Sequence, residues 1–146
     1  MKTDLFHLIP HRPPFLLIDE IIEIDNERLC ARATLRPQDE LWSRVYAGHY
    51  PDNHITPGVL LCEIIFQAGA ALMAHRLGAS SRDKKGTPVV VRIRDARFKR
   101  MVRPGDTLEV EVRFEEQMAN AYLLNGSIKV AGEVAARAAF TCALVS

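Results

Sequence analysis

A histidine, a carboxylate and a carboxamide suited to proton transfer stand close together in this sequence, at His49, Glu63 and Gln67. An imidazole with the ordinary histidine pKa of ~6.5 can accept a proton at neutral pH. A carboxyl group can deliver a proton to a leaving oxygen. The two groups could therefore remove a proton beside a carbonyl and protonate a leaving hydroxyl. We interpret His49 and Glu63 as a candidate acid–base pair.

Glu63 and Gln67 belong to a long apolar run that predicts a helix over residues 58–77. Pro57 suits the first helical turn, and Gly78 suits the C-terminal cap. Because the run is apolar nearly all round, we expect the helix to be buried on most sides. Glu63 and Gln67 are four positions apart and so share one face. Three small side chains continue roughly along that face and leave room for a ligand: Ala70, Ala71 and Ala74.

A buried glutamate at position 63 has two interpretations. Burial costs free energy unless the carboxylate is paired, hydrogen-bonded or protonated, and it raises the pKa of a carboxyl group, which suits a general acid. The alternative is a structural hydrogen bond to Gln67, or a contact with a partner subunit. The preceding loop favours catalysis, because His49 stands just before a helix N-terminus. Free N–H groups at such a terminus could polarise a thioester carbonyl.

The rest of the chain predicts an antiparallel sheet that could wrap this helix. Apolar and polar residues alternate in the later segments, as in half-buried strands. We expect a short helical turn at residues 4–9 and a long loop at 36–57 with a helical turn near 40–46. The expected strands cover residues 16–24, 28–35, 87–98, 108–115, 121–130 and 134–144. One long helix with such a sheet is an α+β fold, which we expect to form a single domain over residues 1–146.

Composition narrows the class of protein. The chain is 48% hydrophobic and 25% charged with a net charge of +1, so neither nucleic acid nor a membrane surface is an expected partner. Residues 1–4 lack the features of a secretory signal, and the apolar run is interrupted by Glu63 and Gln67. The three cysteines suggest neither a disulfide framework nor a zinc site, which favours the cytoplasm. We expect no cofactor and no metal, since His49, His54 and Glu63 make only a weak ligand pattern.

Three blocks of sequence carry a family resemblance. Residues 48–51 (GHYP), 57–60 (PGVL), Glu63 and Gln67 form the first block. Residues 8–19 (LIPHRPPFLLID) form the second, and residues 95–100 (DARFKR) with 104–106 (PGD) form the third. In this order they resemble the signature of bacterial 3-hydroxyacyl-(acyl carrier protein) dehydratases of the FabZ type, and they cover nearly the whole chain.

The resemblance implies a hotdog fold, in which a curved antiparallel sheet wraps one long helix. It implies that His49 of one subunit and Glu63 of another remove water from a 3-hydroxyacyl thioester, giving an enoyl thioester for fatty acid or related biosynthesis. It also implies that Gly58 and Val59 bind substrate and that Gln67 supports the glutamate. From the resemblance we also expect a homodimer or a trimer of dimers, with an acyl tunnel at the dimer interface. The expected partner is an acidic acyl carrier protein.

Two positions depart from the FabZ signature, and two other functions stay open. His54 stands where the signature has proline, and Phe66 stands where it has a small residue. The alternatives are a hotdog thioesterase acting on acyl-CoA and a non-catalytic acyl-binding subunit. The spacing of His49 and Glu63 argues against the thioesterase.

Other polar residues have plainer interpretations. His7, His11 and His75 are expected to be structural or surface residues, and Ser80 and Ser81 to lie in a loop. A basic cluster is either a solvated strand face or, as the resemblance favours, a docking surface for an acidic carrier protein or for coenzyme A phosphates. Its members are Arg92, Arg94, Arg97, Lys99, Arg100 and Arg103.

Overall fold

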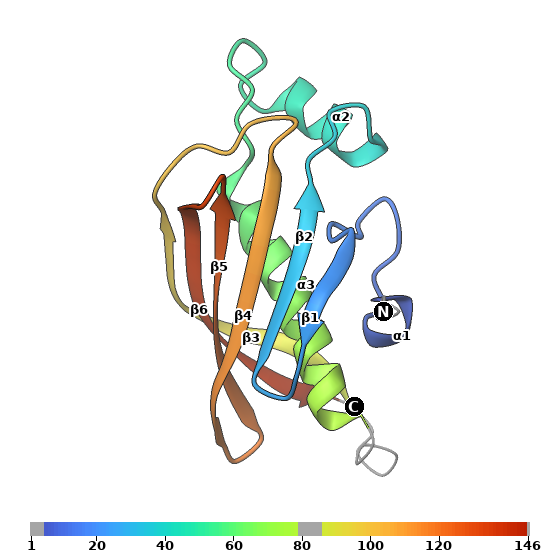
Figure 1. Cartoon of the computed structure of the whole chain (residues 1–146), viewed down its shortest axis with the longest axis vertical. Helices are drawn as coiled ribbons and strands as arrows, with labels where there is room; N and C mark the ends of the chain where they lie inside the picture. The colour runs from blue at the N-terminus through green and yellow to red at the C-terminus, as the bar shows by residue number, and fades with distance from the viewer. Residues whose placement is uncertain (1–4, 79–85, 146) are drawn as a thin grey trace.

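The computed structural model describes residues 5–78 and 86–145, in which a curved sheet wraps along one long helix (Figure 1). The expectations for residues 1–4 and for Ser80 and Ser81 lie outside the described residues. In chain order the elements are α1 (Leu5–Leu8), β1 (Glu20–Ile24), β2 (Arg28–Thr34), α2 (Glu40–Gly48), α3 (Gly58–Leu77), β3 (Thr87–Phe98), β4 (Thr107–Met118), β5 (Ala121–Val130) and β6 (Glu133–Val145). The predicted α+β hotdog architecture is confirmed.

The six strands form one antiparallel sheet in the order β1-β2-β4-β5-β6-β3. The β5–β6 hairpin turns at Ala131 and Gly132, both with left-handed backbone at φ 50° and 82°, as a tight two-residue hairpin requires. β3 lies at one edge of the sheet and, within residues 5–78 and 86–145, pairs with β6 alone. Its outer edge is therefore free for another strand.

The helix α3 fills the concave side of the sheet. Its fully buried side chains come from several faces, as the all-round apolar pattern predicts, and they include Ile64, Ile65, Ala68, Ala71, Leu72 and Met73. β5 approaches the helix closely at Gly126, where an added Cβ would lie 2.5 Å from Cγ2 of Ile65. By length and composition α3 could also cross a membrane, but 56% of its most apolar window is buried inside the protein, as in the core helix of a soluble protein.

Several boundaries differ from the sequence prediction by a residue or more, among them the following two. The strand expected from residue 16 begins only at Glu20, because the backbone before it bonds to a side chain of α3. The N–H of Leu17 donates to Oε1 of Gln67 at 3.0 Å, and the carbonyl of Phe15 accepts from its Nε2 at 2.9 Å. The expected helical turn near residues 40–46 is a complete helix, α2, anchored by buried Trp42 and Tyr46 one turn apart.

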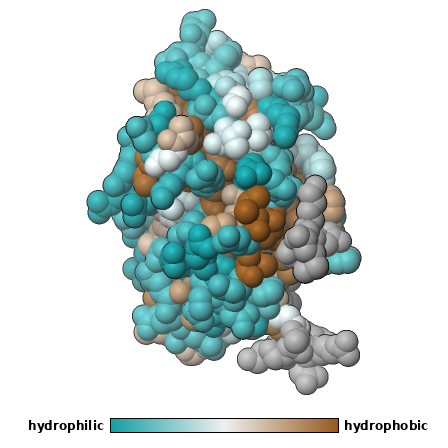
Figure 2. Space-filling view, in the orientation of Figure 1, coloured by the Kyte–Doolittle hydropathy of each residue, from teal (hydrophilic) through white to brown (hydrophobic). Residues whose placement is uncertain are grey.

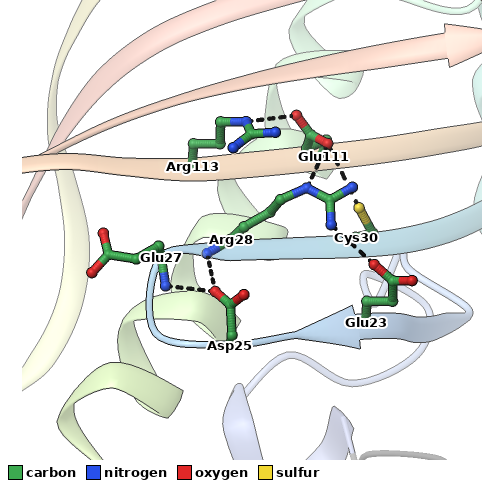
Figure 3. A network of polar contacts seen from close by, with 7 residues as sticks. All are labelled: Glu23, Asp25, Glu27, Arg28, Cys30, Glu111 and Arg113. Carbon is green, nitrogen blue, oxygen red and sulfur yellow. Dashed lines mark hydrogen bonds and ion pairs between the residues drawn. The ribbon is translucent and has the colours of Figure 1, made fainter.

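The outer face of the sheet is mostly hydrophilic, with a hydrophobic area over β1 (Figure 2). A network of charges crosses it (Figure 3). Arg28 Nε donates to Glu111 Oε2 at 2.8 Å, and Arg113 Nε donates to Glu111 Oε1 at 2.9 Å. Partial burial raises the pKa of Glu111, but the hydrogen bonds from Arg28 and Arg113 outweigh that effect and hold it below its ordinary value.

Candidate active site

His49 lies at the junction between α2 and α3. It caps the C-terminus of α2, and its backbone N–H donates to the carbonyl of Val45 at 2.9 Å. Its ring meets the ring of Tyr50 edge-on, with 4.6 Å between centroids. Tyr50 adopts a positive φ of 49°, which reverses the chain after the histidine. The helix end and the turn together fix the position of the imidazole.

The loop between His49 and α3 is tied to the body of the protein. The buried hydroxyls of Tyr46 and Thr56 lie 2.7 Å apart in a hydrogen bond. The N–H of Thr56 donates to the carbonyl of Val102 at 2.8 Å, and Arg103 Nη1 donates to Oδ1 of Asn53 at 3.0 Å. His54, the departure from the signature, packs its ring 6.0 Å from that of Tyr46. The loop is therefore held at several points without the signature proline.

The N-terminus of α3 directs free donors toward the same region. Leu60 and Leu61 donate the first bonds of the helix to the carbonyl of Pro57, at 3.0 and 3.2 Å, so the N–H groups of Gly58 and Val59 precede them. An added Cβ at Gly58 would lie 2.9 Å from Cζ of Phe98. Glycine at this position lets β3 approach the helix end, and it leaves the backbone donors uncovered.

His49, Gly58 and Val59 line one groove of roughly 600 Å³. The side chain of Val59 is mostly exposed there, and Lys99 and Arg100 add positive charge to the lining. The groove thus combines an imidazole, a helix N-terminus, a lysine, and an arginine that is ion-paired with Glu133 at 2.6 Å. Such donors can stabilise negative charge that develops on a carbonyl oxygen.

Glu63 and Gln67 share one face of α3, as predicted. Gln67 Nε2 donates to Oε2 of Glu63 at 3.0 Å. Gln67 is fully buried, and its bonds to Phe15 and Leu17 fix its orientation. Glu63 was expected to be buried, but its side chain is 25% exposed in the single chain. A buried amide therefore holds a carboxylate that solvent or substrate can reach.

His11 is a neighbour of Glu63 that the sequence interpretation missed. Its Nε2 lies 3.6 Å from Oε2 of Glu63, and its ring stacks on Phe15 with centroids 6.4 Å apart. The available signal was its place in the second block of the resemblance, beside the residues that bond to Gln67. No group of three or more potential metal ligands occurs among the described residues.

Glu63 opens into a second pocket, separate from the groove of His49. This pocket has a volume of about 330 Å³. Within one chain, therefore, the predicted acid–base pair is divided between two hollows. Of the small residues expected beside the ligand, Ala70 lines the pocket, whereas Ala71 is fully buried in the core. The pocket lining consists of Leu8, Pro10, His11, Glu63, Phe66, Ala70, Thr87, Pro88, Val89, Val90 and Cys142.

The basic cluster does not form one continuous surface. Arg94 is half-buried and donates to the carbonyls of Leu124 and Phe140 at 2.9 and 3.1 Å, which is a structural role. Arg97 pairs with Asp95 at 3.0 Å. Only Lys99 and Arg100 line the His49 groove. Arg100 is ion-paired with Glu133 at 2.6 Å, so among the described residues Lys99 is the groove cation without a paired carboxylate.

Comparisons with solved structures identify proteins with a similar fold. The dehydratase heterocomplex ApeI:P from Xenorhabdus doucetiae matches with a TM-score of 0.79 at 16% identity, covering 97% of this chain and 91% of that chain. A hypothetical thioesterase from Streptococcus pneumoniae TIGR4, solved with coenzyme A, matches with a TM-score of 0.65 at 14% identity, covering 87% of this chain and 85% of that chain. At these identities the likeness concerns the fold alone.

Sequence comparisons place the family. The FabA-like domain matches residues 9–139. The 3-hydroxyacyl-(acyl-carrier-protein) dehydratase FabZ of Rickettsia bellii is 34% identical over 140 residues, covering 95% of this chain and 92% of its own. The enzyme of the same name from Rickettsia felis is 35% identical over 140 residues with the same coverage. The chain belongs to the FabA-like family and, within it, to the FabZ-type 3-hydroxyacyl-(acyl-carrier-protein) dehydratases.

Proposed function

We propose that this protein removes water from 3-hydroxyacyl thioesters carried by acyl carrier protein, with His49 of one subunit and Glu63 of a second forming each active site. The observation that carries the proposal is the division of the pair between two pockets at opposite ends of one edge strand. Thr87–Val90, at the start of β3, line the Glu63 pocket, whereas Phe98, at its end, lines the His49 groove.

A two-fold axis at the middle of β3 would complete the site. Antiparallel pairing of two copies of this strand lays the start of one against the end of the other. The Glu63 pocket of each subunit would then lie beside the His49 groove of its partner. Val91 and Ile93 are 56% and 52% exposed along this strand in the single chain. Apolar side chains on a free edge strand favour pairing with another chain.

In the completed site each group has one task. Neutral His49 takes the proton next to the thioester carbonyl, and the electron pair of that C–H bond moves into the developing double bond. The N–H groups of Gly58 and Val59 stabilise the negative charge on the carbonyl oxygen. Protonated Glu63 gives its proton to the 3-hydroxyl as the C–O bond breaks, releasing water. Gln67 keeps Oε2 of the carboxyl group occupied, so that Oε1 faces the hydroxyl.

Two further parts of the proposal concern partner and compartment. Lys99 at the His49 groove, beside the ion-paired Arg100, suits the phosphate of a pantetheine arm and the acidic surface of a carrier protein. All three cysteines, Cys30, Cys62 and Cys142, are free thiols. Free thiols suit a reducing compartment such as the cytoplasm.

One assay separates this function from its alternatives. The purified protein is incubated with a 3-hydroxyacyl thioester of acyl carrier protein, and both enoyl thioester and free thiol are measured. We expect enoyl thioester and no free thiol beyond the background. Free thiol as the main product would identify a thioesterase, and binding without either product would identify an acyl-binding subunit.

A further inference from the structure

The Glu63 pocket continues along one face of α3 beyond the carboxylate. Glu63, Phe66 and Ala70 are spaced three and four residues apart, so they follow one another along that face, and all three line the pocket. Val90 of β3 and Cys142 of β6 contribute to the opposite wall. Apart from His11, the lining beyond Glu63 is largely apolar, as a hydrocarbon chain requires.

Phe66 is the largest side chain in this stretch of the pocket, and it is backed by a second ring. Its ring centroid lies 5.0 Å from that of Phe140, with the two planes inclined at 60°, an arrangement that aromatic pairs favour. Phe140 is fully buried. The Phe66 ring therefore packs against the core of the protein.

Phe140 itself cannot retreat from this position toward the helix. It sits directly against α3 at Gly69, where an added Cβ would lie 2.8 Å from its Cζ. Moving a side chain within a core packed to this density costs free energy, because no empty space is available. Phe66 thus has a fixed ring behind it, and an acyl chain entering from Glu63 cannot displace it into the interior.

We propose that Phe66 limits the length of the acyl chain, so that the protein acts on short-chain 3-hydroxyacyl thioesters in preference to long-chain ones. The inference rests on the proposed function, because it assumes that the 3-hydroxyl lies at Glu63. Carbon atoms beyond the 3-hydroxyl then extend along α3. Phe66 stands three residues further on, which is a rise of only about 4.5 Å.

The test compares kcat/KM for 3-hydroxybutyryl and 3-hydroxydecanoyl thioesters of the same carrier. Wild-type protein is expected to favour the shorter substrate. Phe66→Ala removes the ring, and we expect the ratio of long-chain to short-chain kcat/KM to rise by at least about tenfold, the usual effect of methylene groups in an apolar pocket. Adding Ala70→Leu to Phe66→Ala, which puts volume beyond the position of the removed ring, should reverse part of that gain.

Phe114→Ala is the matched control. Phe114 is also a partly buried phenylalanine, but its ring packs against the Arg76 guanidinium at 3.5 Å and lines neither the groove nor the Glu63 pocket. Its replacement should leave the length ratio unchanged. An unchanged ratio in a folded Phe66→Ala protein, or an equal shift in Phe114→Ala, would overturn the inference.

A binding measurement keeps this inference distinct from the proposed function. Butyryl-pantetheine and decanoyl-pantetheine are titrated into the same variants by calorimetry, which requires no turnover. If no substrate is dehydrated, the proposed function fails, but the length limit stands if Phe66→Ala binds decanoyl-pantetheine about tenfold or more tighter than wild type does. If its affinity for both ligands equals that of wild type, the length limit is wrong.

Discussion

Two glutamates in this protein stand in opposite electrostatic surroundings. Glu111, on the outer face of the sheet, accepts hydrogen bonds from Arg28 and Arg113. Glu63, on the central helix, has no arginine or lysine within ion-pair distance among the described residues, and its polar neighbours are Gln67 and His11. Paired guanidinium groups hold a carboxylate in its charged form. An amide donor positions a carboxyl group without requiring that charge. Glu63 is therefore suited to proton transfer, whereas Glu111 is suited to stabilising the fold.

Replacement of the two glutamates should separate these roles most clearly. Glu63→Gln keeps the shape of the side chain but removes the acidic carboxyl proton, so we expect turnover to fall by roughly 10²–10⁴-fold. His49→Ala should cause a loss of the same order. Hydration of an enoyl thioester measures the rate, and light scattering confirms that the oligomer persists. Glu111→Gln serves as the control and should retain near-normal turnover. Near-normal rates in both site variants would mean that the assigned site is wrong.

Gln67 connects the core to the site, so its replacement should affect both. Gln67→Leu leaves the N–H of Leu17 and the carbonyl of Phe15 without their partner. The Leu17 N–H is buried, and a buried unpaired group costs roughly 1–3 kcal/mol. We expect a lower free energy of unfolding in urea together with reduced turnover. Gln117→Leu, at an exposed glutamine, is the matched control and should change neither. Loss of turnover without loss of stability would contradict the packing role of Gln67.

The smallest expected effect concerns the pH dependence of stability. The pKa of Glu111 is lower in the folded protein than its ordinary value of 4.5. Its ion pairs therefore stabilise the fold above pH 4.5, and this contribution disappears as the pH falls through the folded pKa. Since the side chain is 34% exposed, solvent screening limits the effect to about 1 kcal/mol or less.

Urea unfolding of wild type and Glu111→Gln across acidic pH measures this contribution. The two proteins should differ at neutral pH and converge in acid. A difference that grows as the pH falls would show that the arginines do not stabilise the charged form of Glu111.

The central helix was the most predictable part of the fold. Its apolar run begins after Pro57 and ends before Gly78, and the helix covers Gly58–Leu77. Local sequence signals sufficed, because helix propensity, proline and glycine act within a few residues. The late start of β1 was not predictable in the same way. It depends on hydrogen bonds between the Gln67 side chain and backbone groups some 50 positions away, one accepted and one donated by Gln67.

In the site, too, local spacing was predictable from the sequence, whereas contacts between distant segments were not. The shared face of Glu63 and Gln67 followed from helical spacing and is confirmed by their hydrogen bond. The contact between His11 and Glu63 joins segments far apart in sequence, so neither helical nor strand periodicity indicates it. Helical periodicity also left open which neighbours of Glu63 face the pocket. The position of the sheet around the helix determines that Phe66 and Ala70 line the pocket, whereas Ala71 is buried in the core.

The most direct test of the account is to mix two inactive variants, His49→Ala and Glu63→Gln, after dissociating and reassembling them together. If each site combines His49 of one subunit with Glu63 of another, a mixed dimer contains one intact site. Random reassembly should then restore about a quarter of wild-type turnover, since half of the dimers are mixed and each of these has one of its two sites intact. If the mixture stays as inactive as the separate variants although subunit exchange is verified, His49 and Glu63 do not meet across a subunit boundary.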